Sequence, residues 1–253
     1  MRIPFIAGNW KMFKTVQEAV VFVKELRSAV KDVGGVEIVV APPFTALHAV
    51  AEAARNTSIG VAAQNLYWER EGAFTGEVSP AMVREAGAEY AIIGHSERRT
   101  LHGETDEVVA AKTTASLGAG LVPLICVGET AEDLQTHGAS AVPVAQLNAV
   151  LDTIPKGSDF VVAYEPVWAI GSGQAATPEQ AQQVASALRD AIAQKLGDEV
   201  AAATRILYGG SVKAENIAGF MRQPDVDGAL VGGASLDVEG FSAIVRFQKH
   251  VGV

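Results

Sequence analysis

The sequence has few of the residues that mark secreted, membrane-bound or metal-binding proteins. It contains a single cysteine, Cys126, which excludes an internal disulfide framework and any CxxC motif. No apolar run approaches the roughly 18 residues that a membrane span needs, and the first residues are too interrupted for a secretory signal. Neither an HExxH motif nor a Walker A sequence is present. We therefore expect a cytoplasmic protein that binds neither a membrane nor a metal ion.

Positive charge is also scarce. The chain has 20 Lys and Arg against 29 Asp and Glu, which gives a formal net charge of −9. Nucleic-acid binding needs a basic face, so we expect no nucleic-acid partner. A small anionic ligand held by a few local donors is still compatible with this charge. With 49% hydrophobic and 19% charged residues, the 253-residue chain can build a sizeable core.

Short apolar runs alternate with helix-periodic segments along the whole chain. The runs predict eight strands, at residues 4–8, 37–41, 58–63, 90–93, 121–127, 160–164, 205–208 and 228–231. The segments between them predict helices at about 16–30, 45–54, from 80, from about 105, 142–151, 178–196, 216–221 and 241–251. Strict alternation of apolar strands and helices is typical of parallel strands with both faces buried. We therefore predict one domain over residues 1–253, a closed (β/α)8 barrel of eight parallel strands ringed by helices.

In such barrels the chemistry lies at the carboxyl ends of the strands. Polar residues or glycine pairs follow several predicted strands: Asn9 and Lys11, Gln64 and Asn65, His95 and Glu97, Glu165, Gly209 to Ser211, and Gly232 with Gly233. Alone, each has an ordinary interpretation, such as a solvated lysine or a tight turn. Two glycine pairs in adjacent loops favour a phosphate site, because glycine lets backbone N–H groups approach an anion. A histidine near a helix N-terminus is disfavoured as a cation, which suits a neutral hydrogen-bond donor.

The segment around Glu165 has two interpretations. Pro166 pushes the preceding Glu165 toward an extended backbone, and Thr177 with Pro178 predicts the start of the next helix. The apolar, glycine-bearing connection between them is long for a βα loop, which is typical of a lid over a reacting acid. A core-packed loop with a capping glutamate is the alternative. Residues 171–176 also match G-x-G-x-x-G/A, but they lie too far past the strand for a dinucleotide site.

The remaining histidines and the cysteine are expected to be structural. His48, His102, His137 and His250 lie in predicted helices or loops away from the rim. Cys126 lies inside an apolar strand and is expected to be a small buried hydrophobe, not a nucleophile.

Five segments, in order and at barrel spacing, resemble the triosephosphate isomerase family over the full length of the chain. They are residues Gly8 to Met12, Gly72 to Glu77, Ile93 to Arg99, Ala163 to Gly171, and Tyr208 to Val212. The resemblance implies a TIM barrel that interconverts dihydroxyacetone phosphate and D-glyceraldehyde 3-phosphate, in glycolysis and gluconeogenesis. It also implies an enediolate intermediate and no metal or cofactor.

The resemblance assigns roles to the rim residues. Glu165 would move a proton between adjacent carbons, and neutral His95 would polarise the carbonyl; the family is itself the standard example of this pairing. Lys11 and Asn9 would support the developing negative charge, with Glu97 beside them. Phosphate contacts would come from Gly171, Ser211, Gly232 and Gly233. The implied lid comprises Pro166, Val167, Trp168, Ala169, Ile170, Gly171, Ser172, Gly173, Gln174, Ala175 and Ala176.

The resemblance further implies a homodimer. The loop at residues 64–77 would form the interface, with Thr75 reaching the neighbouring subunit's site and Glu77 pairing with Arg98 across it. Two lid positions depart from the commonest family pattern, because Ser172 and Gln174 stand where threonine and lysine are frequent. The departure leaves the chemistry in place and bears on the rate of lid opening.

Two other functions are compatible with a barrel of this kind, since the fold hosts many chemistries. A sugar-phosphate aldolase would need a Schiff-base lysine projecting from a strand interior, and no predicted apolar strand contains one. A non-catalytic dimeric barrel would lack the base or the imidazole, and both are present. The rim residues therefore favour the isomerase.

Overall fold

The computed structural model describes residues 2–170 and 175–251, in which strands alternate with helices along the chain. The strands are β1 (Phe5–Asn9), β2 (Glu37–Ala41), β3 (Ile59–Ala63), β4 (Tyr90–Ile93), β5 (Val122–Val127), β6 (Val161–Tyr164), β7 (Arg205–Tyr208) and β8 (Gly228–Val231). The helices are α1 (Val16–Ala29), α2 (Phe44–Ala54), α3 (Pro80–Glu85), α4 (Ser96–His102), α5 (Asp106–Gly118), α6 (Ala131–His137), α7 (Ala141–Leu151), α8 (Pro178–Leu196), α9 (Asp198–Ala203), α10 (Ile217–Met221), α11 (Val238–Val245) and α12 (Gln248–Val251). Two short 3₁₀ helices, η1 (Val167–Ala169) and η2 (Gly233–Ser235), follow β6 and β8.

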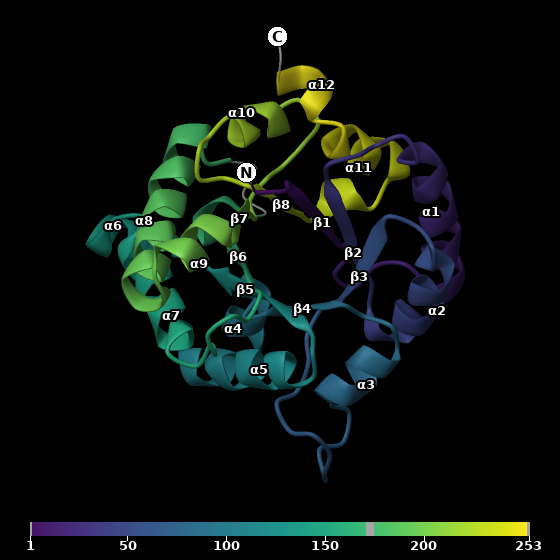
Figure 1. The fold of residues 1–253 in the computed structure, drawn as a ribbon, viewed down its shortest axis with the longest axis horizontal. Helices are drawn as coiled ribbons and strands as arrows, with labels where there is room; N and C mark the ends of the chain where they lie inside the picture. The colour runs from purple at the N-terminus through teal and green to yellow at the C-terminus, as the bar shows by residue number, and fades with distance from the viewer. Residues whose placement is uncertain (1, 171–174, 252–253) are drawn as a thin grey trace.

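The eight strands form a closed parallel barrel in sequence order, and β8 pairs with β1 to close it. Figure 1 shows the strands at the centre with the helices around them. The predicted (β/α)8 barrel is therefore confirmed, and each predicted strand lies within one residue of the observed one at either end. Because all strands are parallel, their carboxyl ends meet at one rim.

Local capping explains where several helices begin. Thr177 caps α8: its hydroxyl accepts a hydrogen bond from the backbone N–H of Gln180, while the Gln180 side chain accepts one from the N–H of Thr177. Thr15 and Glu18 form the same reciprocal pair at the start of α1. These capping boxes satisfy N–H groups that have no partner inside the helix. The predicted start of α8 is thus confirmed, together with the capping contact from which it was predicted.

The helix predictions failed in three places. The short helices α6 and α9 were not predicted; α6 begins at a capping box of Thr130 and Asp133, and α9 has only 6 residues, too few to show a helical period. The predicted helix at 241–251 is two helices, α11 and α12. The first begins earlier than predicted because Asp237 caps it by accepting from the N–H of Gly240 at 2.8 Å. It ends at Val245, and the guanidinium of Arg246, the next residue, is bound to Asp32.

The core has two layers, which follow from the alternation of side chains along each strand. One layer fills the barrel itself and includes Phe5, Tyr90, Leu124 and Leu207. The other lies between strands and helices and is larger. Cys126 belongs to the barrel layer, is fully buried and is free, as its position in an apolar run predicted.

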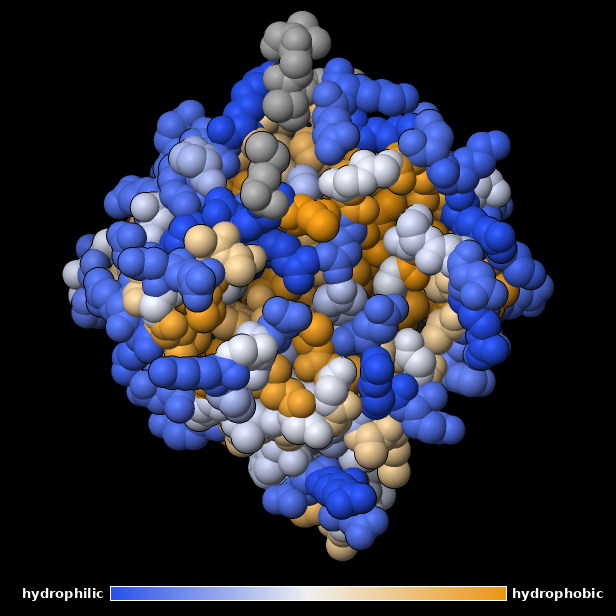
Figure 2. Space-filling view, in the orientation of Figure 1, coloured by the Kyte–Doolittle hydropathy of each residue, from blue (hydrophilic) through white to orange (hydrophobic). Residues whose placement is uncertain are grey.

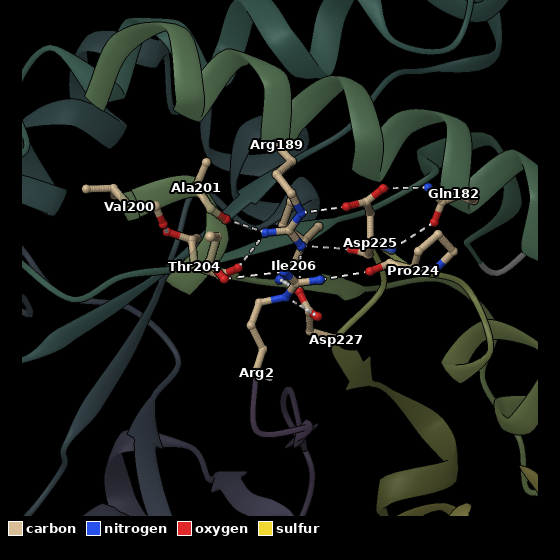
Figure 3. A network of polar contacts seen from close by, with 11 residues as sticks. Arg2, Gln182, Arg189, Val200, Ala201, Thr204, Ile206, Pro224, Asp225 and Asp227 are labelled. Carbon is tan, nitrogen blue, oxygen red and sulfur yellow. Dashed lines mark hydrogen bonds and ion pairs between the residues drawn. The ribbon is translucent and has the colours of Figure 1, made fainter. Parts of the chain in front are cut away.

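A network of polar contacts lies at the amino-terminal ends of β7 and β8 (Figure 3). Arg189 of α8 donates to the carboxylate of Asp225 and to that of Asp227, each at 2.7 Å. It also donates to the carbonyl oxygens of Ala201, Thr204 and Asp225, at 2.6, 2.8 and 3.1 Å. A guanidinium has five N–H groups, so every donor of Arg189 is used. The network joins α8, α9 and the segments that enter β7 and β8.

Candidate active site

A cavity of about 610 Å³ opens at the carboxyl end of the barrel. Residues that follow β1, β4, β6, β7 and β8 line it: Asn9, Lys11, His95, Glu97, Glu165, Ile170, Gly209, Gly210, Ser211, Val212, Lys213, Leu230, Gly232, Gly233 and Ala234. The structure therefore brings together almost all the rim residues predicted from the sequence. Gln64 lies behind them, where its side-chain amide donates to the carbonyl oxygens of Lys11 and Ala41 at 2.9 and 2.8 Å.

Glu165 is the residue directly after β6, and its side chain is almost completely buried, with 2% exposed. Its backbone N–H donates to the carbonyl of Val127 at 2.8 Å, which extends the pairing with β5. One carboxylate oxygen, Oε2, accepts from the backbone N–H of Ser96 at 2.9 Å. The other, Oε1, lies 2.9 Å from Nε2 of His95. A buried carboxylate needs such donors, and here both come from the loop after β4.

His95 caps the N-terminus of α4, and this contact sets its tautomer. Its Nδ1 accepts from the backbone N–H of Glu97 at 3.2 Å, so Nδ1 carries no proton. In the neutral ring the proton must then lie on Nε2, which points to Glu165. The positive end of the helix also disfavours a cationic ring. When the ring is neutral, Nε2–H is therefore the donor that faces Glu165.

The pKa values of the two groups are coupled. Burial raises the pKa of Glu165, but His95, the N–H of Ser96 and Lys11 outweigh burial, so the pKa is lowered overall. Burial lowers the pKa of His95, and the carboxylate of Glu165 raises it above its usual range. The contact between the two side chains contributes to both shifts. If the carboxylate moves away from His95 and Ser96, burial raises its pKa and strengthens it as a base, and burial likewise favours the neutral imidazole.

Lys11 follows β1 in a left-handed backbone conformation, with φ of 50°. Its N–H donates to the side-chain oxygen of Asn9 at 3.0 Å, and its ammonium is bound to the carboxylate of Glu97. A left-handed conformation at a residue other than glycine costs about 1–3 kcal/mol and is retained where surrounding contacts hold it. Here the contacts direct a cation into the cavity opposite His95 and Glu165.

Glycine stands in the two pairs for different physical reasons. A Cβ on Gly209 would lie 2.9 Å from Cγ of Glu165, and one on Gly210 would lie 2.2 Å from the hydroxyl of Tyr208. The pair after β7 is therefore required by packing. By contrast, a Cβ on Gly232 meets nothing closer than 3.7 Å, and one on Gly233 meets nothing within 4 Å. Only the pair after β8 leaves space that a ligand could use.

Ser211 and Gly232 face this space from adjacent loops. Among the described residues, no protein atom accepts a hydrogen bond from the backbone N–H of either one. Free N–H groups directed at an open cavity are the usual means of holding a phosphate group. The predicted phosphate residue Gly171 lies outside the described residues.

The loop after β5 is a part of the site that the sequence analysis missed. Glu129 is completely buried, and its Oε1 accepts from the hydroxyl of Tyr164 at 2.9 Å and from the indole N–H of Trp168 at 2.7 Å. Its carbonyl also accepts from the N–H of Val167 at 3.1 Å. Burial raises the pKa of Glu129, although the bonds to Trp168 and Tyr164 lower it. This acid follows a strand end as Glu165 does, so the same positional rule could have found it.

Gly128, next to Glu129, packs directly on the reacting segment. A Cβ there would lie 1.8 Å from the carbonyl oxygen of Glu165, so only glycine fits. Its N–H donates to the side-chain oxygen of Gln146 of α7 at 2.8 Å. The loop after β5 therefore supports both Glu165 and the beginning of the predicted lid.

The predicted lid is described at its two ends only. After Pro166 the chain forms η1, whose Ala169 is buried and whose Trp168 is tied to Glu129. At the other end the N–H of Ala176 donates to the hydroxyl of Tyr208 at 3.2 Å. Ser172, Gly173 and Gln174, like Gly171, lie outside the described residues. Both ends are thus held by contacts to the barrel loops.

The three predicted interface residues lie on or near the loop between β3 and α3, which projects beyond the ring of helices (Figures 1 and 2). Thr75 and Glu77 are exposed on this loop, and Arg98 of α4 is bound to Glu104 of the same chain. Phe74, a large hydrophobic side chain on this loop, is 40% exposed.

Within residues 2–170 and 175–251, no group of three or more His, Cys, Asp or Glu side chains is placed to hold a metal ion. None of the helices in this same part of the chain has the length and apolar character to cross a membrane.

Comparison with known proteins points to one family. A family profile described as Triosephosphate isomerase matches residues 4–248. The triosephosphate isomerase of Leifsonia xyli is 60% identical over 256 residues, which covers 99% of both chains. That of Trichlorobacter lovleyi is 55% identical, covering 98% of this chain and 100% of the relative. That of Carboxydothermus hydrogenoformans is 52% identical, covering 97% and 99% respectively.

Proposed function

The chain belongs to the triosephosphate isomerase family and interconverts dihydroxyacetone phosphate and D-glyceraldehyde 3-phosphate, and we propose that Glu165 and His95 carry this reaction. The observation that supports the assignment is the contact between them. A buried carboxylate oxygen of Glu165 and Nε2 of the His95 imidazole lie 2.9 Å apart in one cavity. Glucose breakdown and synthesis by this route, glycolysis and gluconeogenesis, both require this isomerisation.

An aldose–ketose isomerisation moves one proton between adjacent carbons and another between their oxygens. Glu165 removes the proton from the carbon next to the carbonyl, and electrons move onto the carbonyl oxygen to give an enediolate. The N–H of His95 stabilises that oxygen and exchanges protons with the two oxygens of the intermediate. Protonated Glu165 then returns its proton to the neighbouring carbon. General acid–base catalysis of this kind contributes about 10²–10⁴-fold.

Glu165 must leave Ser96 and His95 to reach a substrate carbon. In the present arrangement those two donors hold its pKa below the ordinary value, which makes it a weak base. Substrate binding between Glu165 and His95 removes the donors and leaves burial, which raises the pKa. The base is therefore strongest when it faces the substrate.

Lys11 and Asn9 stabilise the negative charge that develops on the substrate oxygens. The ammonium of Lys11 lines the cavity and is held by Glu97, and Asn9 is buried next to it. Preorganised groups of this kind need no rearrangement when the charge appears. Glu97 acts through Lys11, whose position it sets.

The phosphate group is held by backbone N–H groups of Ser211, Gly232 and Gly233, with Gly171 contributing from the lid. Residues 166–176 close over the bound substrate, because an enediolate next to a phosphate can eliminate that phosphate when water has access. The anchoring of both ends of this segment, at Glu129 and Tyr208, supports a hinged motion of the part between them.

We further propose that residues 1–253 act as one domain, that the protein is a cytoplasmic homodimer, and that Thr75, Glu77 and Arg98 lie in the interface. The projecting loop and the exposed Phe74 support an interface there, since a large exposed apolar side chain on such a loop favours association. Sedimentation at micromolar concentration tests the dimer; a monomer at that concentration would contradict it.

A coupled enzyme assay on purified, metal-stripped protein tests the reaction itself. We expect turnover of both triose phosphates without added metal or cofactor. No turnover in a folded sample would contradict the proposal.

A further inference from the structure

Lys213 is a second cation at the cavity, and the reaction as described does not use it. It lines the same cavity as Ser211 and Gly232, and its side chain is exposed. Lys11, the other lysine that lines the cavity, is bound to the carboxylate of Glu97. Within the described part of the chain, the ammonium of Lys213 forms neither an ion pair nor a hydrogen bond with a protein group.

The backbone at Lys213 is held in place by the side chain of Asn216 and by the backbone of Ile217. Asn216 accepts from the N–H of Lys213 through its Oδ1 at 2.8 Å and donates from its Nδ2 to the carbonyl of Ser211 at 2.9 Å. The N–H of Ile217, the first residue of α10, donates to the carbonyl of Lys213 at 3.0 Å. The position of the lysine at the cavity edge is therefore set by the fold, while its ammonium stays free.

The free ammonium of Lys213 sets the charge balance of the cavity lining. The charged side chains that line the cavity are Lys11, Lys213, Glu97 and Glu165, two of each sign. The whole chain has a formal net charge of −9, which repels a phosphate dianion at long range. Without Lys213 the cavity lining would carry a net negative charge as well.

We propose that Lys213 is a specificity-determining residue that captures the phosphate group of the substrate at the cavity edge and guides it to the N–H groups of Ser211 and Gly232. The proposal rests on the proposed function only in taking the substrate to be a phosphate ester. Because the ammonium is exposed, it acts mainly on encounter and on affinity, and the proton transfers at Glu165 and His95 proceed without it. Its influence is reduced by salt, since the screening length falls from about 30 Å at 0.01 M to about 8 Å at 0.15 M.

The test compares Lys213→Gln with a matched variant, Lys156→Gln. Lys156 is also exposed and lies in the loop that enters β6, at the opposite end of the barrel, so both variants change the net charge equally. At 0.01 M salt we expect Lys213→Gln to lower kcat/KM for dihydroxyacetone phosphate about fivefold, mostly through KM. The kcat/KM of Lys156→Gln should stay close to that of the unmodified protein. Lys213→Arg should restore the value, and the loss should shrink at 0.15 M salt.

Two further readouts separate capture from local damage. Turnover of D-glyceraldehyde, which lacks the phosphate, should be the same in Lys213→Gln and the unmodified protein. Inhibition by inorganic phosphate should weaken by a factor similar to the loss in kcat/KM. Equal behaviour of the Lys213 and Lys156 variants, or an equal loss with D-glyceraldehyde, would overturn the proposal.

The outcome also distinguishes this proposal from the isomerase assignment. If the unmodified protein did not turn over triose phosphates, the isomerase assignment would fail. Calorimetric titration of inorganic phosphate into the unmodified protein and Lys213→Gln would still test Lys213. Weaker binding only in that variant supports the capture role, and unchanged binding contradicts it.

Discussion

The two ends of the barrel each carry a cluster of charged side chains, and the clusters differ in how completely their groups are paired. At the amino-terminal end Arg189 uses every donor on groups of the protein. At the carboxyl-terminal rim, Glu165 has two donors, both from one loop, and Lys213 has no partner among the described residues. A fully paired network stabilises the fold and offers nothing to a ligand. A partly paired one can exchange protein contacts for substrate contacts.

The rim also contains backbone strain and close packing around the reacting acid. Lys11 has a φ of 50°, and Gly128 and Gly209 lie too close to Glu165 for any larger residue. Strain and tight contacts at a functional site are compensated by stability elsewhere in the structure. The network around Arg189 is one place where this fold supplies such stability.

The largest expected effect comes from removing the base. Glu165→Gln keeps the shape of the side chain but cannot accept a proton, so we expect kcat to fall about 10²–10⁴-fold. The control is Glu85→Gln on the exposed surface of α3, which should leave kcat unchanged. Steady-state kinetics measures kcat, and thermal unfolding measures the stability of each variant. Full activity in Glu165→Gln would contradict the assignment of Glu165 as the base.

The opposite end should lose stability and keep its activity. Arg189→Met removes the cation that Asp225 and Asp227 share; Asp227 keeps its ion pair with Arg2, whereas Asp225 loses the guanidinium. Removing one partner of a buried ion pair costs about 3 kcal/mol or more in the free energy of unfolding. Lys195→Met, on the same helix, breaks an exposed pair with Asp152 and should cost less than about 1 kcal/mol. Denaturant unfolding gives both values. A normal unfolding midpoint with reduced kcat for Arg189→Met would contradict the expectation that this end of the barrel serves stability and the rim serves catalysis.

Packing against the base should matter for rate more than for stability. Gly209→Ala places a Cβ 2.9 Å from Cγ of Glu165, so the carboxylate must shift. A displacement of about 1 Å at a reacting group can cost up to about 10²-fold, and we expect a loss of at least about tenfold in kcat. Gly34→Ala, where nothing lies within 4 Å of the new Cβ, serves as the control. Similar kinetics for the two variants would show that Gly209 is not needed to position Glu165.

The smallest expected effect is on the pH dependence of stability at the rim. The pKa of Glu165 is lowered in the folded chain, so its carboxylate stabilises the fold above the pKa of the unfolded chain, near 4.5. That contribution is lost as pH falls through the lower folded pKa. We expect the unmodified protein to lose more unfolding free energy than Glu165→Gln as pH falls below about 4.5. Parallel stability curves for the two proteins would show that the contacts of Glu165 do not stabilise the fold.

Much of the site could be predicted because it depends on local patterns. Apolar runs of strand length located all eight strands, and the residues after them identified Asn9, His95 and Glu165 as rim residues. The capping box at Thr177 located the start of α8. These signals arise from side chains a few residues apart, which the sequence displays directly. The short helices α6 and α9 were missed because so few residues show no clear period.

Other features depend on contacts between residues far apart in the chain. The sequence alone established the order of strands and helices, and with it the rim on which an acid, an imidazole and a lysine would meet. Only the tertiary structure decided that Ser96 and His95 hold Glu165, that Glu129 anchors Trp168, and that Gly209 is a packing residue. It also decided that Arg189 binds Asp227, across 38 positions of sequence. The physical reason is that periodicity and caps are local, whereas the partner of a buried polar group is chosen by how the closed barrel packs.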